Sequence, residues 1–133
     1  MRPALTDVNH VTLCVSDLEK SIAFYRNVLG AKLRAQWATG CYFELGTLWL
    51  CLEQSDSVTP RSDDSHIAFS TTGDLTDWDN HLRQNAQIWK ENRSPDPSVY
   101  FLDPDGHKLE LHSGTLASRL AHYSTRSDVT LYD

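Results

Sequence analysis

The chain has 133 residues, a formal net charge of −6 and a composition that is 40% hydrophobic and 23% charged. This length is typical of one domain with a buried core. The acidic balance argues against a nucleic-acid surface, although a local cluster of positive charge would still hold a small anion. No apolar run approaches the roughly 20 residues of a membrane span, and no secretory segment follows Met1. The three cysteines are odd in number and form no Cys-x-x-Cys pair, so we expect a reduced, cytoplasmic protein.

An approximate internal repeat organises the chain. Two short predicted strands, "NHVTLCV" at 9–15 and "SHIAFST" at 65–71, each carry histidine at the second position. Each strand is followed by a helical pattern and then by three extended segments, which predicts the order βαβββ twice. The polar stretch "EQSDSVTPRSDDS" joins the two halves. We therefore expect a single domain at 1–133, with a first module at about 5–53, a linker at 54–64, a second module at about 65–120 and a tail at 121–133.

Two amphipathic helices are predicted, one in each half. In "SDLEKSIAFYRNVLG" the Ser16-x-x-Glu19 spacing predicts a capping box, and Gly30 stands where the helix should stop. In "GDLTDWDNHLRQN" Asp74 is the predicted N-cap. Apolar residues recur at helical spacing along both segments, which predicts one buried face on each helix.

The segment "YFLDPDGHKLELHSG" at 100–114 predicts a hairpin. Asp103-Pro104-Asp105-Gly106 has proline and glycine where a type I turn favours them. The strand after the turn alternates, so Glu110 points to the face opposite Leu109 and Leu111. By the same parity, His10 and His66 begin their halves on the face opposite the apolar residues.

Two imidazoles and one carboxylate from separate strands form a plausible ligand set for a divalent ion with open coordination positions. Nitrogen and oxygen donors without thiolate suit Mn²⁺, Fe²⁺, Ni²⁺ or Zn²⁺, and the spacing does not choose among them. A single strand histidine is more often a core or surface residue, and we assign that role to the histidines outside this set: His81, His107, His112 and His122. The joint placement at equivalent repeat positions singles out His10, His66 and Glu110.

These motifs resemble the vicinal-oxygen-chelate superfamily, which includes glyoxalase I, extradiol dioxygenases and the fosfomycin-resistance proteins. Within this superfamily, the resemblance to the glutathione-transferring fosfomycin-resistance enzymes, the FosA type, is close, and it runs from about Leu5 to Leu120. The matching text includes "NHVTL", "SIAFYRNVLG", "ELGTLWLCL", "SHIAF", "WKENRS" and "YFLDPDGHKLELHSGTLASRL". The last two segments are specific to this type.

The resemblance implies an α+β fold of paired βαβββ modules, in a homodimer that exchanges modules. One site would take His10 from one subunit and His66 with Glu110 from the other, to hold Mn²⁺ with K⁺ nearby. The implied reaction adds the thiol of glutathione to the epoxide of fosfomycin, a small phosphonate. The resemblance implies phosphonate contacts from Thr12, Lys90, Ser94, Tyr100 and Arg119.

Other positions carry weaker implications. By resemblance, Trp49 packs against the carbon skeleton of the drug, Tyr42 orients or activates the glutathione sulfur, and Trp37 and Arg93 lie along the path of the tripeptide. The implied potassium loop contains Asn92, Ser94, Asp96, Ser98 and Tyr100. This loop departs from the family pattern, because "SPDPS" replaces a flexible acidic-glycine stretch and its two prolines remove amide hydrogens. Glu53 would repel an acidic thiol donor, so the identity of that donor is open.

Four alternatives remain. A hydrolytic relative (FosX type) would use water and needs a general base, for which Glu44 is the nearby carboxylate before the "LW" strand. A bacillithiol-using relative has a longer segment before the "YF" strand. A binding or immunity module of the same fold would sequester the antibiotic without turnover, and such modules generally lack the ligand triad. A dioxygenase or glyoxalase usually draws ligands from more strands, whereas Leu50 stands at the first-half position equivalent to Glu110.

Overall fold

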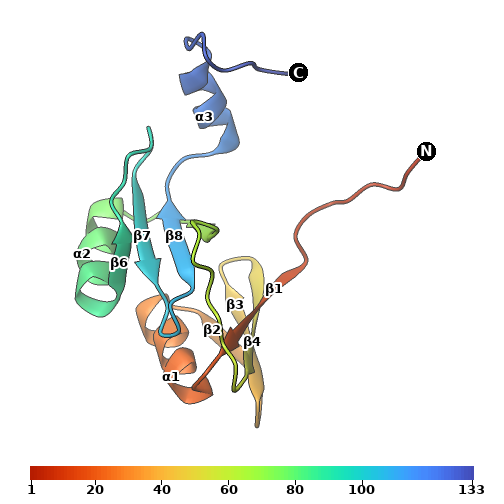
Figure 1. Ribbon diagram of the computed structural model, residues 1–133, viewed down its shortest axis with the longest axis vertical. Coiled ribbons are helices and arrows are strands. Elements are labelled where there is room, and N and C mark those ends of the chain that lie inside the picture. Colours follow the sequence, from red (N-terminus) through yellow and green to blue (C-terminus); the bar gives the residue numbers. More distant parts are fainter. The chain divides into compact units, whose positions relative to one another are not determined.

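A computed structural model describes all 133 residues, which form two compact units, 1–60 and 61–133 (Figure 1). Both units have the predicted order βαβββ, and the second unit adds a C-terminal helix. The expected α+β fold with two four-stranded sheets is therefore confirmed. None of its helices is long and apolar enough to cross a bilayer.

The sheet of the first unit has the strand order β1-β4-β3-β2. The strands β1 and β4 are parallel, and the other neighbours are antiparallel. In chain order the elements are β1 (His10–Val15), α1 (Leu18–Ala23), the π-helical turn η1 (Phe24–Val28), β2 (Lys32–Trp37), β3 (Gly40–Leu45) and β4 (Leu48–Gln54).

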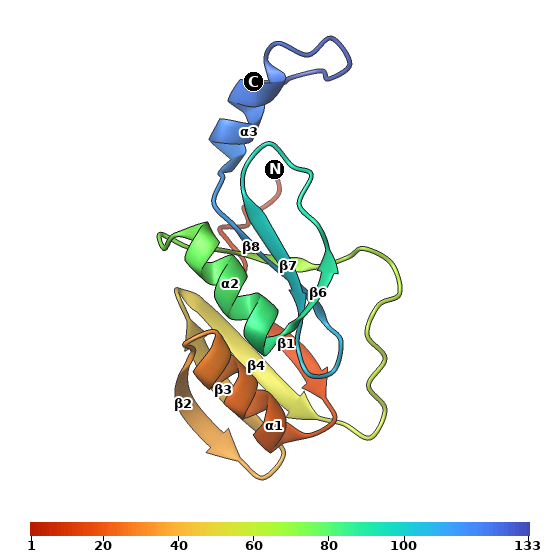
Figure 2. The same cartoon turned by 90° about the vertical axis from the view of Figure 1, so that its left-hand side faces the viewer.

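The second unit repeats this topology with the strand order β5-β8-β7-β6, and β5 is parallel to β8. Figure 2 shows α1 and α2 each lying across the sheet of its own unit. The elements are β5 (Ile67–Ser70), α2 (Leu75–Asn85), β6 (Gln87–Lys90), β7 (Ser98–Leu102), β8 (Lys108–His112) and α3 (Leu116–Tyr123).

The helix starts and stops follow the sequence, with one correction. Asp74 caps α2 as predicted, since its side chain accepts a hydrogen bond from the Thr76 amide. At α1 the predicted Ser16 capping box is wrong: Asp17 is the N-cap, and its carboxylate accepts from the Lys20 amide. A carboxylate one residue further along offers a charged acceptor to the amides of the first turn, which favours it over the hydroxyl. Gly30, with φ of 74°, ends the helical segment as expected.

Each face of the first sheet has a distinct role. Phe43 on β3 packs against Tyr25 of η1, with ring centroids 6.2 Å apart, and both side chains are buried. Leu50 and Leu52 of β4 are also buried, so this face forms the core under the helix. The opposite face carries the alternate residues of the strands, His10 among them, and those residues are largely exposed.

The β7–β8 hairpin positions the last strand of the second unit. The Asp103 carbonyl accepts from the Gly106 amide at 3.0 Å, which closes the predicted turn. The Asp103 carboxylate also accepts from the amides of Asp105 and His107, both at 2.9 Å. Gly106 has φ of 89°, a conformation that glycine adopts without strain. The turn thus fixes the register that pairs Tyr100 with Glu110.

Replacing Phe43 by alanine should lower the free energy of unfolding by about 3–5 kcal/mol, because a fully buried aromatic ring leaves a cavity. The neighbouring Glu44→Ala change is a matched control, since this exposed carboxylate pairs only with Arg34 at the surface and should cost about 0–1 kcal/mol. Urea unfolding of the full chain measures both values. Equal losses for the two variants would contradict the assignment of the core face.

Candidate functional site

The second unit brings two predicted metal ligands into contact. Glu110 lies in the centre of β8, and only 8% of its side chain is exposed. His66 stands immediately before β5, one residue outside the strand that the sequence predicted to contain it. Because β5 is parallel to β8 with Ala68 opposite Glu110, the imidazole comes to the same part of the sheet. The distance from His66 Nε2 to Glu110 Oε1 is 2.8 Å.

The hydrogen bonds of His66 leave Nε2 as the atom that would bind a metal in the predicted site. His66 Nδ1 lies 2.7 Å from the Asp64 carbonyl oxygen, which only accepts hydrogen bonds, so Nδ1 carries a proton. In the neutral ring, Nε2 then directs a lone pair at the Glu110 carboxylate. Two electron-pair donors facing each other need a cation between them, either a proton or a metal ion. The donor set therefore fits a divalent metal, with Asp64 in the orienting role that backbone carbonyls commonly have in metal sites.

The third predicted ligand, His10, lies in the first unit at the start of β1. Its Nδ1 is 2.7 Å from Asn9 Oδ1, so Nε2 would be the ligand atom in the predicted site. Its ring packs on Trp49, with centroids 4.5 Å apart. No set of three His, Cys, Asp or Glu side chains in this chain is arranged to hold a metal ion. The structure thus joins His66 with Glu110, and the part of His10 stays a prediction.

Basic and hydroxyl groups lie on the Glu110 face of the second sheet. Tyr100 is opposite Glu110 on β7, and Lys90 is opposite Tyr100 on β6. Lys90 Nζ lies 5.2 Å from the centroid of the Tyr100 ring, in a cation–π contact. Ser98 Oγ donates to Glu110 Oε2 at 2.5 Å. These predicted residues therefore share one face with the Glu110–His66 pair.

Arg119 lies on α3, whose N-terminus carries a capping box formed by Thr115 and Ser118. Its guanidinium carbon is 5.9 Å from the ring centroid of Tyr123. The buried Arg119 Nε has no hydrogen-bond acceptor. An unmatched buried donor on a cation is costly, and a bound anion would satisfy it.

The open face of the first sheet carries a row of aromatic rings. Trp37 and Tyr42 meet edge to face with centroids 4.8 Å apart, and Tyr42 meets Trp49 in the same way at 5.2 Å. All three side chains are exposed, by 42%, 38% and 39% respectively. Thr12 lies two residues after His10 on β1, so it is on the same face of the sheet, and it is exposed. The structure therefore groups the predicted drug-packing and thiol-side aromatic residues.

The predicted potassium loop is closed by its own hydrogen bonds. Ser94 Oγ contacts Asn92 Oδ1 and the Asp96 carbonyl oxygen, both at 2.7 Å. The Asn92 side-chain amide donates to the same carbonyl at 3.2 Å. The Asp96 carboxylate instead accepts from Ser118 Oγ of α3, at 3.2 Å. Arg93 is exposed. The loop therefore offers oxygen atoms to a cation, while its carboxylate contacts α3.

Two residues at the site escaped the sequence interpretation. His112, assigned a structural or surface role, lies with Nδ1 3.3 Å from Glu110 Oε2 and 2.5 Å from Ser98 Oγ. Trp89 packs against His66 and Tyr100, with centroid distances of 5.6 and 5.3 Å. The two-residue spacing of 110 and 112 on one strand was the signal for His112. The bulge between Ile88 and Lys90 hid Trp89 from a parity argument.

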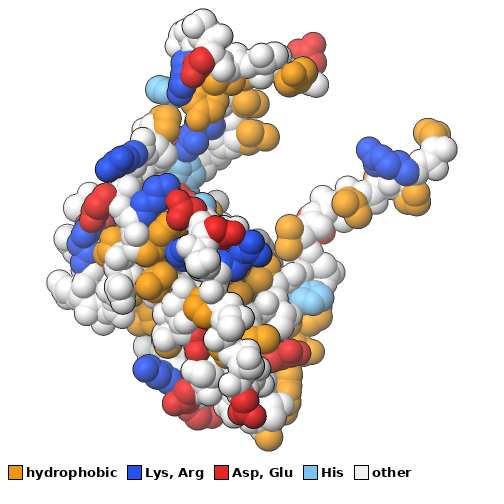
Figure 3. All heavy atoms as spheres, viewed as in Figure 1, with side chains coloured by type: hydrophobic (Ala, Val, Ile, Leu, Met, Phe, Trp, Pro, Cys, Tyr) orange, Lys and Arg blue, Asp and Glu red, His pale blue; other side chains and the backbone are white.

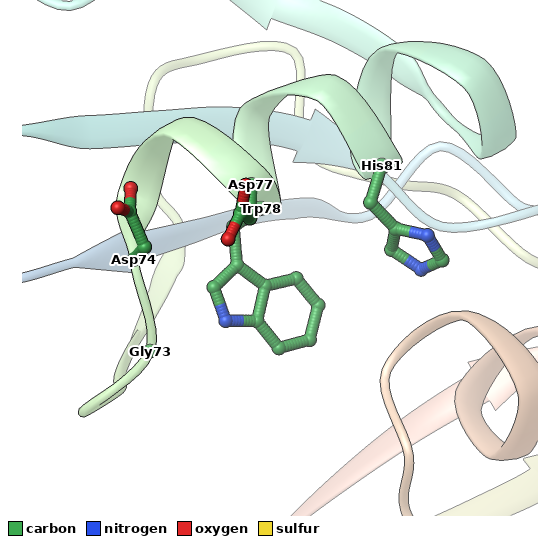
Figure 4. A pocket seen from close by; sticks show the side chains of 5 residues that line it. All are labelled: Gly73, Asp74, Asp77, Trp78 and His81. Carbon is green, nitrogen blue, oxygen red and sulfur yellow. The ribbon is translucent and has the colours of Figure 1, made fainter.

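A separate pocket of about 350 Å³ lies along α2, lined by Gly73, Asp74, Asp77, Trp78 and His81 (Figure 4). None of these residues belongs to the predicted site. Asp74 caps the helix and the Trp78 indole donates to Thr71 Oγ1 at 3.1 Å, so two of the polar groups already have structural partners. On the molecular face drawn in Figure 3, acidic and basic side chains are interspersed.

Comparisons with known proteins agree with this geometry. Residues 7–111 match the model of the Glyoxalase/Bleomycin resistance protein/Dioxygenase superfamily. The chain is 49% identical over 123 residues to the glutathione transferase FosA of Serratia marcescens, covering 88% of this chain and 87% of that protein. It is 44% identical over 125 residues to the metallothiol transferase FosB of Staphylococcus haemolyticus, covering 87% of this chain and 89% of that protein. The chain belongs to the fosfomycin-resistance family of the glyoxalase superfamily.

Solved structures support the same family. FosX of Listeria monocytogenes complexed with Mn(II) and sulfate matches with a TM-score of 0.80 and 30% identity, covering 90% of this chain and 99% of that chain. A glutamine mutant of the same FosX, complexed with Mn(II) and 1S,2S-dihydroxypropylphosphonic acid, matches with a TM-score of 0.79 and 29% identity, covering 88% and 99%. The fold and family are thus established, while the relatives include thiol transferases as well as FosX.

Because some relatives in this family transfer thiols, the cysteines of the chain itself are relevant. Cys41 lies on β3, is fully buried and forms no disulfide. Burial raises the pKa of its thiol to about 11 from an ordinary 9.0. At a pH below both values, this shift lowers the thiolate fraction about 100-fold.

We expect iodoacetamide at pH 8 to leave Cys41 unmodified in the native protein, because both burial and the raised pKa suppress its thiolate. Raising the pH toward 11 should speed alkylation of the folded chain, because a larger fraction of the Cys41 thiol then ionises. Peptide mass spectrometry measures the modification, and the urea-unfolded chain serves as the control in which Cys41 must react. Rapid native alkylation of Cys41 would contradict its burial and its raised pKa.

Proposed function

We propose that this protein inactivates fosfomycin by adding the thiol of glutathione to the epoxide ring. The observation that carries the proposal is the 2.8 Å contact between His66 Nε2 and Glu110 Oε1, on the face that also carries Lys90 and Tyr100. The 49% identity to a glutathione transferase FosA favours glutathione as the thiol donor. The reducing cytoplasm, where glutathione is abundant, suits a chain whose three cysteines form no disulfide.

The proposed metal site consists of His66 and Glu110 with His10 as the third ligand. Because the second unit supplies two ligands, the site needs His10 from a first unit, and we propose that it comes from the other subunit of a module-exchanging homodimer. Bound Mn²⁺ would supply Lewis-acid stabilisation of the charge that develops on the epoxide oxygen. FosX structures complexed with Mn(II) favour this metal. The same proposal includes the division of the chain into two modules, 5–53 and 65–120, joined by the linker 54–64.

The proposed anion contacts are Lys90, Arg119 and three hydroxyl residues, Thr12, Ser94 and Tyr100. A phosphonate would give the buried Arg119 Nε the acceptor that it lacks within the chain. Lys90 would add a second cation from β6. Two cations favour a doubly charged phosphonate over a neutral ligand.

The thiol side of the proposed site is the open aromatic face. Trp49 would pack on the carbon skeleton of the drug, and Tyr42 would orient the sulfur. Trp37 and Arg93 would line the tripeptide. In the reaction the sulfur–carbon bond forms while the epoxide carbon–oxygen bond breaks, and the thiol proton ends on the new hydroxyl group.

The loop residues Asn92, Ser94, Asp96, Ser98 and Tyr100 are the proposed K⁺ site. The inward carbonyl of Asp96 and the hydroxyl of Ser94 support this role, since K⁺ takes oxygen ligands. A hydrolytic FosX-type reaction is the second candidate, because FosX structures match the whole fold. Transfer of another thiol is a further candidate, because the chain is 44% identical to a metallothiol transferase FosB.

Incubation of the protein with fosfomycin, Mn²⁺ and glutathione should produce the glutathione adduct, detected by mass spectrometry of the drug. His66→Ala and Glu110→Gln should abolish turnover, because each removes a metal ligand. Glu91→Gln is the matched control, since this exposed glutamate pairs with Arg83 away from the ligands, and it should keep wild-type turnover.

The same assay separates the alternatives. A diol product would establish hydrolysis, and unmodified drug bound one to one would establish sequestration. An adduct formed only with another thiol would change the donor and keep the reaction class. Wild-type rates from both ligand variants in metal-stripped buffer would refute the metal assignment. Replacing K⁺ by Na⁺ should lower the rate if the loop holds K⁺.

Lys90→Ala and Arg119→Ala should each raise the Michaelis constant for fosfomycin about 10- to 100-fold, because each removes a charge-assisted hydrogen bond to the phosphonate. Lys32→Ala and Arg26→Ala remove the same charges at exposed positions of the first unit and should leave that constant unchanged. Initial rates at varied drug concentration measure the effect. An unchanged constant for Lys90→Ala and Arg119→Ala would contradict their role as anion contacts.

A further inference from the structure

The two oxygens of Glu110 have different partners. Oε1 faces His66 Nε2, as described above, whereas Oε2 accepts from Ser98 Oγ at 2.5 Å. His112 Nδ1 is also 2.5 Å from Ser98 Oγ. His112 comes from the same strand as Glu110, and Ser98 lies opposite His112 on β7. Three side chains of two adjacent strands therefore meet at one carboxylate oxygen.

The donors in this cluster have a single consistent direction. A carboxylate only accepts, so the one hydroxyl hydrogen of Ser98 points to Glu110 Oε2. Ser98 Oγ must then accept from His112, which places a hydrogen on Nδ1. The result is a chain of two hydrogen bonds, His112 Nδ1–H to Ser98 Oγ–H to Glu110 Oε2. Hydrogen bonds aligned in this way strengthen one another.

The far side of the His112 ring is also held. Its Nε2 lies 3.9 Å from Asp96 Oδ2, and Asp96 accepts from Ser118 Oγ at 3.2 Å. Gly114 leaves the space for this contact, because a Cβ there would lie 2.1 Å from Asp96 Oδ2 and 2.7 Å from His112 Nε2. Only 19% of the His112 side chain is exposed. The ring is thus fixed between Ser98 and the loop that carries Asp96.

We propose that His112 is a positioning residue for the metal site, which acts through Ser98 to hold Glu110 Oε2 and so presents Oε1 to the metal. This inference rests on the proposed metal site. It assigns a role to a histidine outside the ligand set and to the hydroxyl of Ser98 as the link between them. Outer partners that orient a ligand in this way commonly change metal affinity 10- to 100-fold when they are removed.

The test is Mn²⁺ binding to the full chain without fosfomycin or glutathione, measured by electron paramagnetic resonance of the unbound ion. His112→Phe keeps the ring volume and removes the donor, and it should weaken binding about 10- to 100-fold. His112→Asn places an amide donor near the position of Nδ1 and should restore affinity to within about threefold of wild type. Ser98→Ala should also weaken binding, and the double variant should lose less than the sum of the two single losses, because both side chains hold the same carboxylate oxygen.

Gly114→Ala probes the cluster from outside, since it removes none of the hydrogen-bonding groups and displaces Asp96 and His112. It should weaken Mn²⁺ binding in the same direction. Thermal unfolding of each variant in metal-free buffer excludes a general loss of structure. Equal Mn²⁺ affinity for wild type and His112→Phe, or equal losses for the phenylalanine and asparagine variants, would overturn the inference.

A second readout does not depend on metal. Nitrogen-15 NMR of the metal-free protein should show the His112 ring with hydrogen on Nδ1, and Ser98→Ala should alter that signal. A His112 ring with hydrogen on Nε2 alone would contradict the inferred hydrogen-bond chain from His112 through Ser98 to Glu110, whether or not the protein binds metal. A protein that shows this tautomer and His112-dependent Mn²⁺ binding but leaves fosfomycin intact would refute the proposed reaction and keep the positioning role.

Discussion

The carboxylate of Glu110 is the group on which the structure of the second unit depends. It is nearly buried in the middle strand pair, between Leu109 and Leu111, and a charge in such a place costs several kcal/mol unless partners replace the lost water. Here both oxygens have partners, His66 on one side and Ser98 on the other. Because the buried charge is tolerated only with these partners, it also holds the partners in position. This constraint accounts for the convergence of residues from β7, β8 and the segment before β5 on one point.

The sheet makes that convergence possible at low conformational cost. β8 is hydrogen-bonded on both sides, parallel to β5 and antiparallel to β7, so its backbone is held at every residue. Side chains on β7 and β8 are therefore placed by register rather than by flexible loops. The hairpin turn at Asp103 fixes that register through three hydrogen bonds to backbone amides. Rigid strands are a favourable origin for ligands that must keep a defined separation.

Much of this arrangement could be predicted from two patterns in the sequence, the alternation along the strands and the internal repeat. The alternation of Leu109, Glu110 and Leu111 placed the carboxylate apart from the apolar face, and the repeat placed both histidines at equivalent positions. The cap of α1 could not be resolved in the same way, since Ser16 and Asp17 are adjacent oxygen donors and the choice depends on backbone angles. The role of His112 was also hidden, because parity gives the face of a residue and says nothing of which atom it contacts. The aromatic row was predicted only as separate residues, since ring contacts between strands require the register.

Under the proposed function, the two units would have different parts in the chemistry, which follow from the surface of each unit. The first sheet leaves three aromatic rings substantially exposed to water, which is unfavourable. A group of exposed apolar side chains of this kind indicates a binding surface. In the second unit, Glu110 and His66 contact each other and Glu110 also accepts from Ser98, but this unit contains only two of the three expected ligands. The first unit has an apolar surface and one predicted ligand, His10. The second unit has a polar cluster and the other two predicted ligands, so neither unit contains the whole predicted site. Under the proposed function the aromatic rings meet the carbon skeleton and the thiol donor while the polar cluster holds the charged end. The opposed character of the two repeated halves is then the physical basis for binding a ligand that is itself half apolar and half anionic.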